Sequence, residues 1–371
     1  MFLAILLAAC GSAPAAAPDA GSDAFVAPVV PSAPVITHAV PPATRIAIPA
    51  GAVLAGSRPG TPFRRPSVEA DLARVDVPAF EIDRRTDVNQ GRADPQRVAF
   101  RQAQATCAER GGRLCEELEW ERACEGDAHT PLPSSDWAAC SAHPAQCASS
   151  LGVIAPGVMA PEWTTSHGQA VLRGARDDQD MPMHRCDARV PLTDPSDREA
   201  AVRCCYGDAP SLGYPTTQVG LPFSALDVSV EALRAAMRST PELAAWADDF
   251  TPFALADAER AYTRADLIVD ETTRARLAPG PLVWSPANGE RAWLFAGQSG
   301  ADTIIAVLYP LADESVVHGA SFVFRGEHVP VAITPVPRER TSVSWASAVG
   351  RAGESGVVRF DEDGVIRIVA Q

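Results

Sequence analysis

The stretch GRLCEELEWERAC, residues 112–124, decides the fold that we expect for the first part of the chain. It begins at the pair Gly111-Gly112, which predicts the end of a preceding helix over residues 98–110, because glycine readily adopts the backbone of a helix C-terminal cap. Acidic residues follow and favour the first turn of a new helix. We therefore expect a second helix over Arg113–Cys124 that buries Trp120.

Two apolar stretches before this helix pair predict strands. Arg45–Ile48 runs into a turn at Pro49–Gly51. Val75–Asp83 alternates apolar and polar residues, as a half-buried strand does. Helices and short strands together indicate an α+β domain, to which we assign residues 44–208.

These elements, in this order, resemble the motifs of the formylglycine-generating enzyme family, also called the sulfatase-modifying-factor domain. Gly112–Glu121 is similar to the family's G-x-R-L-P-T-E-x-E-W-E, and Cys107 matches the cysteine before it. The other matching segments are Ile48–Gly51, Arg173–Ala175, Arg185–Arg189 and Ala201–Cys204. The resemblance implies a C-type-lectin-like α+β fold with little regular structure.

The N-terminus predicts export. Residues 1–9 form a short apolar segment, and Leu7-Ala8-Ala9-Cys10 resembles the bacterial lipobox, whose cysteine receives a lipid and becomes the new N-terminus. An apolar N-terminus with a chance cysteine is the alternative. Residues 10–43 add a linker rich in Ala and Pro, which cannot bury enough apolar surface to fold. We expect a cell-envelope lipoprotein that faces the periplasm or the exterior, with the membrane as a partner through its lipid.

Composition excludes several function classes. The net charge of −14 argues against a nucleic-acid partner, which requires a basic surface. The sequence contains no lysine, which excludes phosphate-loop ATPases, protein kinases, pyridoxal-phosphate enzymes and serine–lysine hydrolases. About 330 residues follow the linker, which suggests two domains.

Eight cysteines lie between Cys107 and Cys205, and an even number in an exported chain favours disulfides. A metal site at Cys140, His143 and Cys147 is the alternative. The resemblance implies the bonds Cys107–Cys204 and Cys124–Cys186. A local bond Cys140–Cys147 is then plausible, which leaves Cys115 for Cys205.

The family's catalytic copper ligands have no counterpart here. Active members hold copper with two cysteines between the motifs that correspond to Arg173–Ala175 and Arg185–Arg189, and this interval has none. Met181, Met183 and His184 offer only a weaker set of ligands. Of the polar groups in the family's calcium-associated element only Glu162 remains. We therefore expect no enzyme activity, no cofactor and no metal.

A binding role is the leading hypothesis, and an oxidase of the formylglycine-generating type, or a relative with altered chemistry, is the alternative. The ligand would be a protein, glycan or peptide that the sequence does not identify. Five charged residues could line the family's substrate groove, but we favour the alternative of a charged loop without a ligand; these are Arg173, Arg176, Asp177, Asp178 and Asp180.

Residues 209–371 predict a second α+β domain of unknown family. Ser229–Met237 is amphipathic, and Thr240-Pro241 and Thr251-Pro252 suggest further helix starts. Asn288-Gly289 and Asp363-Gly364 predict hairpin turns of an antiparallel sheet. The expected strands are Leu282–Trp284, Ala292–Phe295, Thr303–Tyr309, Ser321–Phe324, Val329–Ile333, Val357–Phe360 and Val365–Val369.

Overall fold

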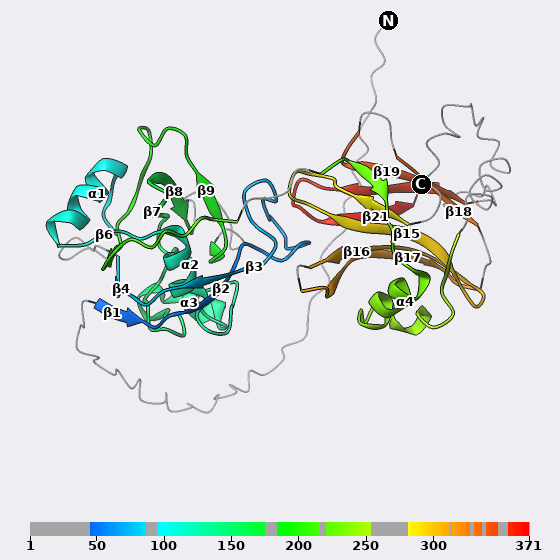
Figure 1. Ribbon diagram of the computed structural model, residues 1–371, viewed down its shortest axis with the longest axis horizontal. Helices are drawn as coiled ribbons and strands as arrows, with labels where there is room; N and C mark the ends of the chain where they lie inside the picture. Colours follow the sequence, from blue (N-terminus) through cyan, green and yellow to red (C-terminus); the bar gives the residue numbers. More distant parts are fainter. Residues whose placement is uncertain are drawn as a thin grey trace, which may run out of the picture. The chain divides into compact units, whose positions relative to one another are not determined.

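The computed structural model describes residues 45–86, 95–174, 184–215, 220–253, 281–311, 313–326, 330–335, 339–347 and 355–370 (Figure 1). Residues Ala43–Gln371 form one compact unit. Helices and mainly antiparallel sheets are both present, with strands predominating, so the expected class is confirmed at this level. The signal segment, Cys10 and the whole linker lie outside the described residues.

None of the helices in these described segments is both long and apolar enough to cross a membrane.

The described residues of the N-terminal half (within residues 45–215) form three small sheets. The first has the order β1 (Arg45–Ile48), β4 (Phe80–Asp83), β11 (Cys204–Tyr206) and β6 (Arg113–Leu114). The second has the order β5 (Arg97–Ala99), β10 (Glu199–Ala201), β7 (Glu162–Ser166), β8 (Gln169–Arg173) and β9 (Arg189–Pro191). Strands β2 (Gly51–Ala55) and β3 (Ala73–Val77) form the third.

The expected strand Val75–Asp83 is divided into β3 and β4. Pro78 and Ala79 are both exposed, which interrupts the alternation of buried and exposed residues. Pro78 also has no amide hydrogen to donate to a neighbouring strand. The break therefore lets β3 and β4 join different sheets.

Helix α1 (Phe100–Glu109) lies within the expected range and ends before Gly111, which has the positive φ of 72° that glycine tolerates. Helix α2 (Glu117–Glu125) begins four residues later than expected. Arg113–Leu114 forms β6 instead, and Glu116 begins the helix through a capping box with Glu119. A short helix, α3 (Trp137–Ala142), follows.

Among the described residues, two large clusters of buried side chains and a smaller one around Cys140–Cys147 form the core of the N-terminal half. Trp120 on α2 belongs to one large cluster, which lies against β1, β2 and β4. Trp163 on β7 belongs to the other large cluster, which lies against α1 and β8. Leu212 and Tyr214 pack against the first cluster, so the chain stays on this half beyond residue 208. The domain boundary placed there remains a prediction.

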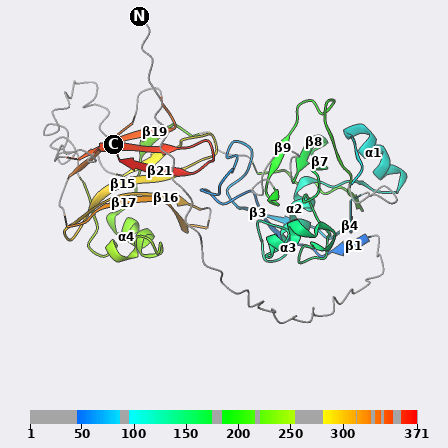
Figure 2. The same cartoon turned by 180° about the vertical axis from the view of Figure 1, so that it is seen from behind.

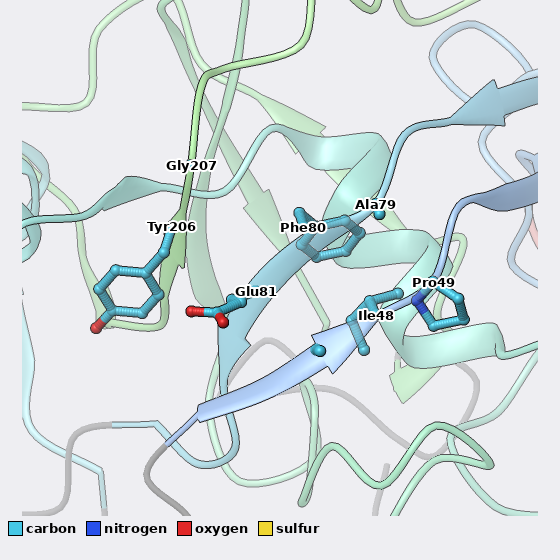
Figure 3. A pocket seen from close by; sticks show the side chains of 8 residues that line it. Ile48, Pro49, Ala79, Phe80, Glu81, Tyr206 and Gly207 are labelled. Carbon is cyan, nitrogen blue, oxygen red and sulfur yellow. The ribbon is translucent and has the colours of Figure 1, made fainter.

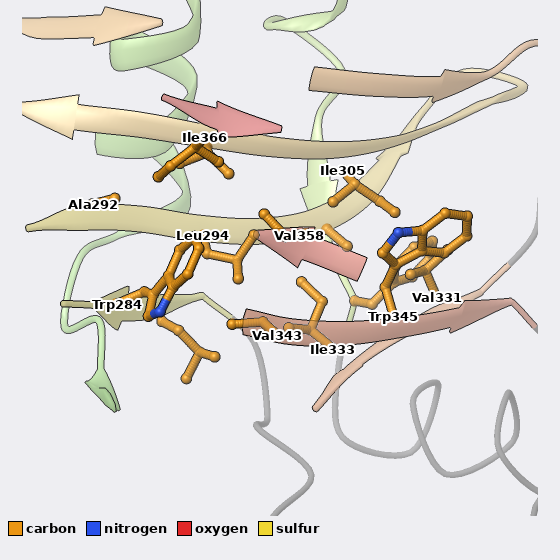
Figure 4. Close-up of a cluster of buried hydrophobic side chains, with 14 of the residues drawn as sticks. Trp284, Ala292, Leu294, Ile305, Val331, Ile333, Val343, Trp345, Val358 and Ile366 are labelled. Carbon is orange, nitrogen blue, oxygen red and sulfur yellow. The ribbon is translucent and has the colours of Figure 1, made fainter. Parts of the chain in front are cut away.

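The C-terminal half (residues 220–370) is built around two antiparallel sheets. One contains β12 (Phe223–Ala225), β14 (Leu282–Trp284), β15 (Ala292–Ser299), β16 (Asp302–Pro310) and β17 (Val316–Phe324). The other contains β18 (Val331–Pro335), β19 (Ser342–Ser347), β20 (Ser355–Phe360) and β21 (Ile366–Ala370). Trp284 and Leu294 of the first sheet meet Val343 and Trp345 of the second in one hydrophobic cluster (Figure 4).

Helix α4 (Val230–Arg238) covers the other face of the first of these sheets (Figure 2). Leu233 and Met237 pack against Ile304 and Leu308 of β16. Both faces of β16 are therefore buried, which explains its continuous apolar sequence.

Two expectations for this half require correction. Thr251-Pro252 does not start a helix; it forms β13, which pairs with β15 through Gln298 and Gly297. The position at the edge of the sheet suits a proline, which cannot donate a hydrogen bond there. Strand β19 was missed, because its alternating serines lower the hydrophobicity of the segment.

Candidate functional site

Four disulfides hold the N-terminal half together; they include the two that the resemblance implied and the local bond, and they also pair Cys115 with Cys205, which the sequence left open. They are Cys107–Cys204, Cys115–Cys205, Cys124–Cys186 and Cys140–Cys147. Consecutive residues of a strand point to opposite faces. Cys204 therefore enters the cluster around Trp163, whereas Cys205 enters the cluster around Trp120. The bond Cys140–Cys147 also removes two thiols from the alternative metal site.

Arg173 does not line a groove. Its side chain is fully buried, and Nη2 donates hydrogen bonds to Glu121 Oε2 at 2.7 Å and Glu117 Oε2 at 3.2 Å. Its Nη1 donates to the carbonyl oxygens of Cys186 and Asp187. The expectation for Arg173 was wrong, because the buried glutamates of α2 bind its guanidinium inside the domain. The other proposed groove residues, Arg176, Asp177, Asp178 and Asp180, lie outside the described residues.

Three glutamates spaced four residues apart, Glu117, Glu121 and Glu125, form one buried face of α2. Arg189 binds Glu117 with two hydrogen bonds of 2.7 Å, in the paired geometry that suits a guanidinium and a carboxylate. Glu125 differs, because its Oε2 accepts no hydrogen bond from any described residue. Burial, together with the charges of Glu121 and Asp187, raises the pKa of Glu125 well above its usual value.

Asp187 adds a further buried carboxyl group to this network. Burial raises its pKa to about 8, although Arg185 lies 2.9 Å from Oδ1 and opposes the shift. The network of α2 therefore contains carboxyl groups whose pKa is raised by burial. Such groups are candidates for function, but buried ion-pair networks with a purely structural role also perturb pKa values.

Tyr214 closes the network from the connector between the two halves. The guanidinium of Arg189 lies 3.7 Å from the centre of its ring, within the range of a cation–π interaction. The Tyr214 hydroxyl accepts a hydrogen bond from the amide of Ala70 at 3.4 Å. Burial raises the pKa of the phenol well above its usual value. Our sequence reasoning missed Tyr214, because it lies beyond the expected domain boundary in a segment without periodicity.

Both carboxylate oxygens of Glu162 accept hydrogen bonds from other residues of the protein. Its Oε2 accepts from Trp120 Nε1 at 2.8 Å and Arg203 Nε at 2.7 Å. Its Oε1 accepts from Gly157 N at 2.9 Å and Arg203 Nη2 at 3.1 Å. Glu162 of β7 therefore connects α2 with the segment after Ala201.

Gly174 and His184, which lie on either side of residues 175–183, both contact Gly157. A Cβ atom on Gly157 would lie 2.6 Å from the Cα atom of Gly174, so these two backbones can approach only as glycines. His184 Nδ1 lies 3.3 Å from the Gly157 carbonyl oxygen, and its ring lies 5.0 Å from that of Trp137. Burial lowers the pKa of His184. Met181 and Met183 lie outside the described residues.

An open hollow of about 530 Å³ lies where β1, β4 and β11 end (Figure 3). Its lining is mostly apolar and includes Ile48, Phe80 and Tyr206, with the exposed Glu81 at its rim. Arg45 stacks on the Tyr206 ring at 3.4 Å. The hollow provides surface for a contact but brings no reactive groups together.

Among the described residues, no group of three or more His, Cys, Asp or Glu side chains is arranged to hold a metal ion.

No model of a known protein family matches this chain, and no curated protein matches its sequence.

Proposed function

We propose that this chain is an exported bacterial lipoprotein, attached to a membrane through Cys10, with a non-catalytic domain of the formylglycine-generating enzyme type. The state of the cysteines is the observation that carries the proposal. All eight cysteines from Cys107 to Cys205 form disulfides, and the sequence contains only one other, Cys10. The folded part therefore has no free thiolate pair for the copper ion of an oxidase.

A C-type-lectin-like fold is proposed for the N-terminal half. Short helices and small sheets around two tryptophan-centred clusters are compatible with it. The bonds Cys107–Cys204 and Cys124–Cys186 join positions 97 and 62 residues apart, as the resemblance implies. Long loops on such a rigid core can carry a binding surface without catalytic groups.

The compartment is supported by the same bonds. Four disulfides are typical of proteins outside the reducing cytoplasm. The proposed lipid on Cys10 and the linker that follows it would hold the folded part away from a membrane surface, facing the periplasm or the exterior. We propose a protein, glycan or peptide as ligand of the folded part.

The role of Glu162 supports the loss of catalysis. Four donors from Trp120, Arg203 and Gly157 occupy its two oxygens. A carboxylate engaged in this way would have to break buried hydrogen bonds before it could bind an ion, and such bonds are costly to leave unmade. We therefore assign Glu162 a structural role.

The decisive experiment measures copper and product together. The full chain carrying Cys10→Ser is loaded with copper(I), desalted, and incubated under oxygen with a Cys-x-Pro-x-Arg peptide. We expect no stoichiometric copper and no thiol-to-aldehyde change in the mass of the peptide. One tightly bound copper per chain together with the aldehyde product would instead establish the oxidase.

A further inference from the structure

The loop of residues 56–72, between β2 and β3, contains the buried charged side chains Arg64 and Glu69. Ser57 N donates to Ala70 O at 3.0 Å, which closes the base of the loop. Ser57 Oγ donates to Glu69 Oε2 at 2.6 Å and accepts from Arg64 Nε at 3.1 Å. Arg64 is only 4% exposed. The loop is therefore fixed by its own polar core.

One side of this loop is held by the N-terminal half. Gly56 N donates to Glu121 Oε1 at 2.8 Å, and Arg189 Nη1 donates to Val68 O at 2.7 Å. Arg185 Nη2 donates to both carboxylate oxygens of Glu69, at 3.2 and 3.1 Å. The loop thus belongs to the buried network of α2.

The other side of the loop contacts the C-terminal half. Arg64 Nη1 donates to Glu290, which precedes β15 and is 2% exposed. Phe63 N donates to Asp363 O at 2.6 Å in the turn between β20 and β21. A Cβ atom on Gly60 would lie 3.0 Å from the ring of Tyr309 on β16. One loop therefore reaches both halves of the chain.

The backbone of Phe63 is constrained at this junction. Its φ of 61° lies in the left-handed region, which is unfavourable for a bulky residue. Hydrogen bonds fix both of its peptide groups, because its amide binds Asp363 O and its carbonyl oxygen accepts from Arg185 Nη2 at 3.4 Å. Strain of this kind persists only where the surroundings hold it.

We propose that loop 56–72 is a clasp that joins the two halves into one cooperatively unfolding unit, with Arg64 as the residue that closes it. Within the described residues, the hydrophobic clusters of the two halves share no member. The cooperativity therefore depends on polar contacts such as Arg64–Glu290. Arg64 also binds Asp71 within the loop, so a variant without the Glu290 carboxylate loses the ion pair to the C-terminal half while Arg64 keeps a counter-charge in the loop. Arg185 binds Glu69 in the loop and precedes Cys186, so it connects the clasp to the disulfide Cys124–Cys186 of α2.

The test uses the full chain carrying Cys10→Ser, with intact disulfides. Calorimetry should show a single unfolding transition, which Glu290→Gln should divide into two. In Glu290→Gln, hydrogen exchange at amides 57–70 and 361–365 should become at least about tenfold faster, while the amides of α1 keep their rates. Arg238→Met is the matched control, because it breaks an exposed ion pair with Glu231 and should change neither result.

Native-state hydrogen exchange on the parent chain, which carries Cys10→Ser alone, provides a second measurement. It does not depend on whether the Glu290→Gln variant folds. The slowest amides of both halves should open with the same free energy and the same dependence on denaturant. Different opening free energies for the two halves would contradict the clasp. A single transition in Glu290→Gln, or unchanged exchange at residues 57–70, would contradict it as well.

Discussion

Arg203 donates two hydrogen bonds to Glu162, from Nε at 2.7 Å and from Nη2 at 3.1 Å, and both side chains are essentially unexposed. The same carboxylate accepts from the indole of Trp120. This pair therefore fixes Trp120 of α2 relative to the start of β7. The resemblance associates Glu162 with ion binding, whereas here its carboxylate binds buried donors of the protein itself.

Replacing Glu162 by Gln should lower the free energy of unfolding by about 3–5 kcal/mol, since Arg203 would remain buried without a counter-charge. Urea unfolding monitored by tryptophan fluorescence measures the change. Glu199→Gln removes an exposed carboxylate and should alter stability by less than about 0.5 kcal/mol. A loss below about 1 kcal/mol in Glu162→Gln would show that Arg203 is satisfied without it.

Removing disulfides one at a time should produce unequal losses. Cys107–Cys204 closes a separation of 97 residues and Cys140–Cys147 one of 7. In the chain-entropy description these correspond to about 4–5 and about 2 kcal/mol of stabilisation. Paired Cys→Ser variants and urea unfolding test the order. Equal losses would indicate that native contacts, and not loop length, set the contribution of each bond.

Lipidation of Cys10 is testable in a bacterial host. Full-length protein should incorporate labelled fatty acid and partition into detergent, and Cys10→Ser should abolish both, because the proposed lipid has no other attachment point. Cys140→Ser serves as a control, since it removes a different thiol and should leave the label in place. Incorporation that persists in Cys10→Ser would show that the N-terminus is not a lipobox.

The sequence predicted local features better than long-range partners. The range of α1 and its end before Gly111 follow from residues close in the chain. The resemblance supplied the bonds of Cys107 and Cys124, which spacing alone leaves open. The spacing of Glu117 and Glu121 is visible on inspection. Their partner Arg173 lies more than 50 residues away, so only the fold reveals a buried ion pair in place of a groove.

Local rules failed where tertiary contacts outweighed them. Thr251-Pro252 has the composition of a helix start, yet pairing with Gly297 makes it a strand. Leu114 suits a helix, but its pairing with Cys204 extends a sheet and delays α2. Both cases show sheet pairing across the chain overriding propensity.

Asp187 should make the protein less stable as the pH rises from about 5 to about 8. Its folded pKa is raised from 3.8 to about 8, chiefly by burial, so the folded state holds a proton that the unfolded state releases in this window. Stability is then complete below the unfolded pKa and falls as the pH approaches the folded pKa, by up to about 1.4 kcal/mol per pH unit for one group.

Asp187→Asn removes this titration and keeps the size of the side chain. We expect a flatter dependence of the free energy of unfolding on pH, and a variant more stable than the parent at about pH 8 by on the order of 2 kcal/mol. Urea unfolding across the pH range provides the measurement. Glu125, whose pKa is also raised, should preserve part of the slope. Asp208→Asn changes an exposed carboxyl and should leave the pH profile unchanged. If Asp187→Asn keeps the parental slope, or is less stable at about pH 8, Asp187 is ionised in the folded protein and its pairing with Arg185 outweighs burial.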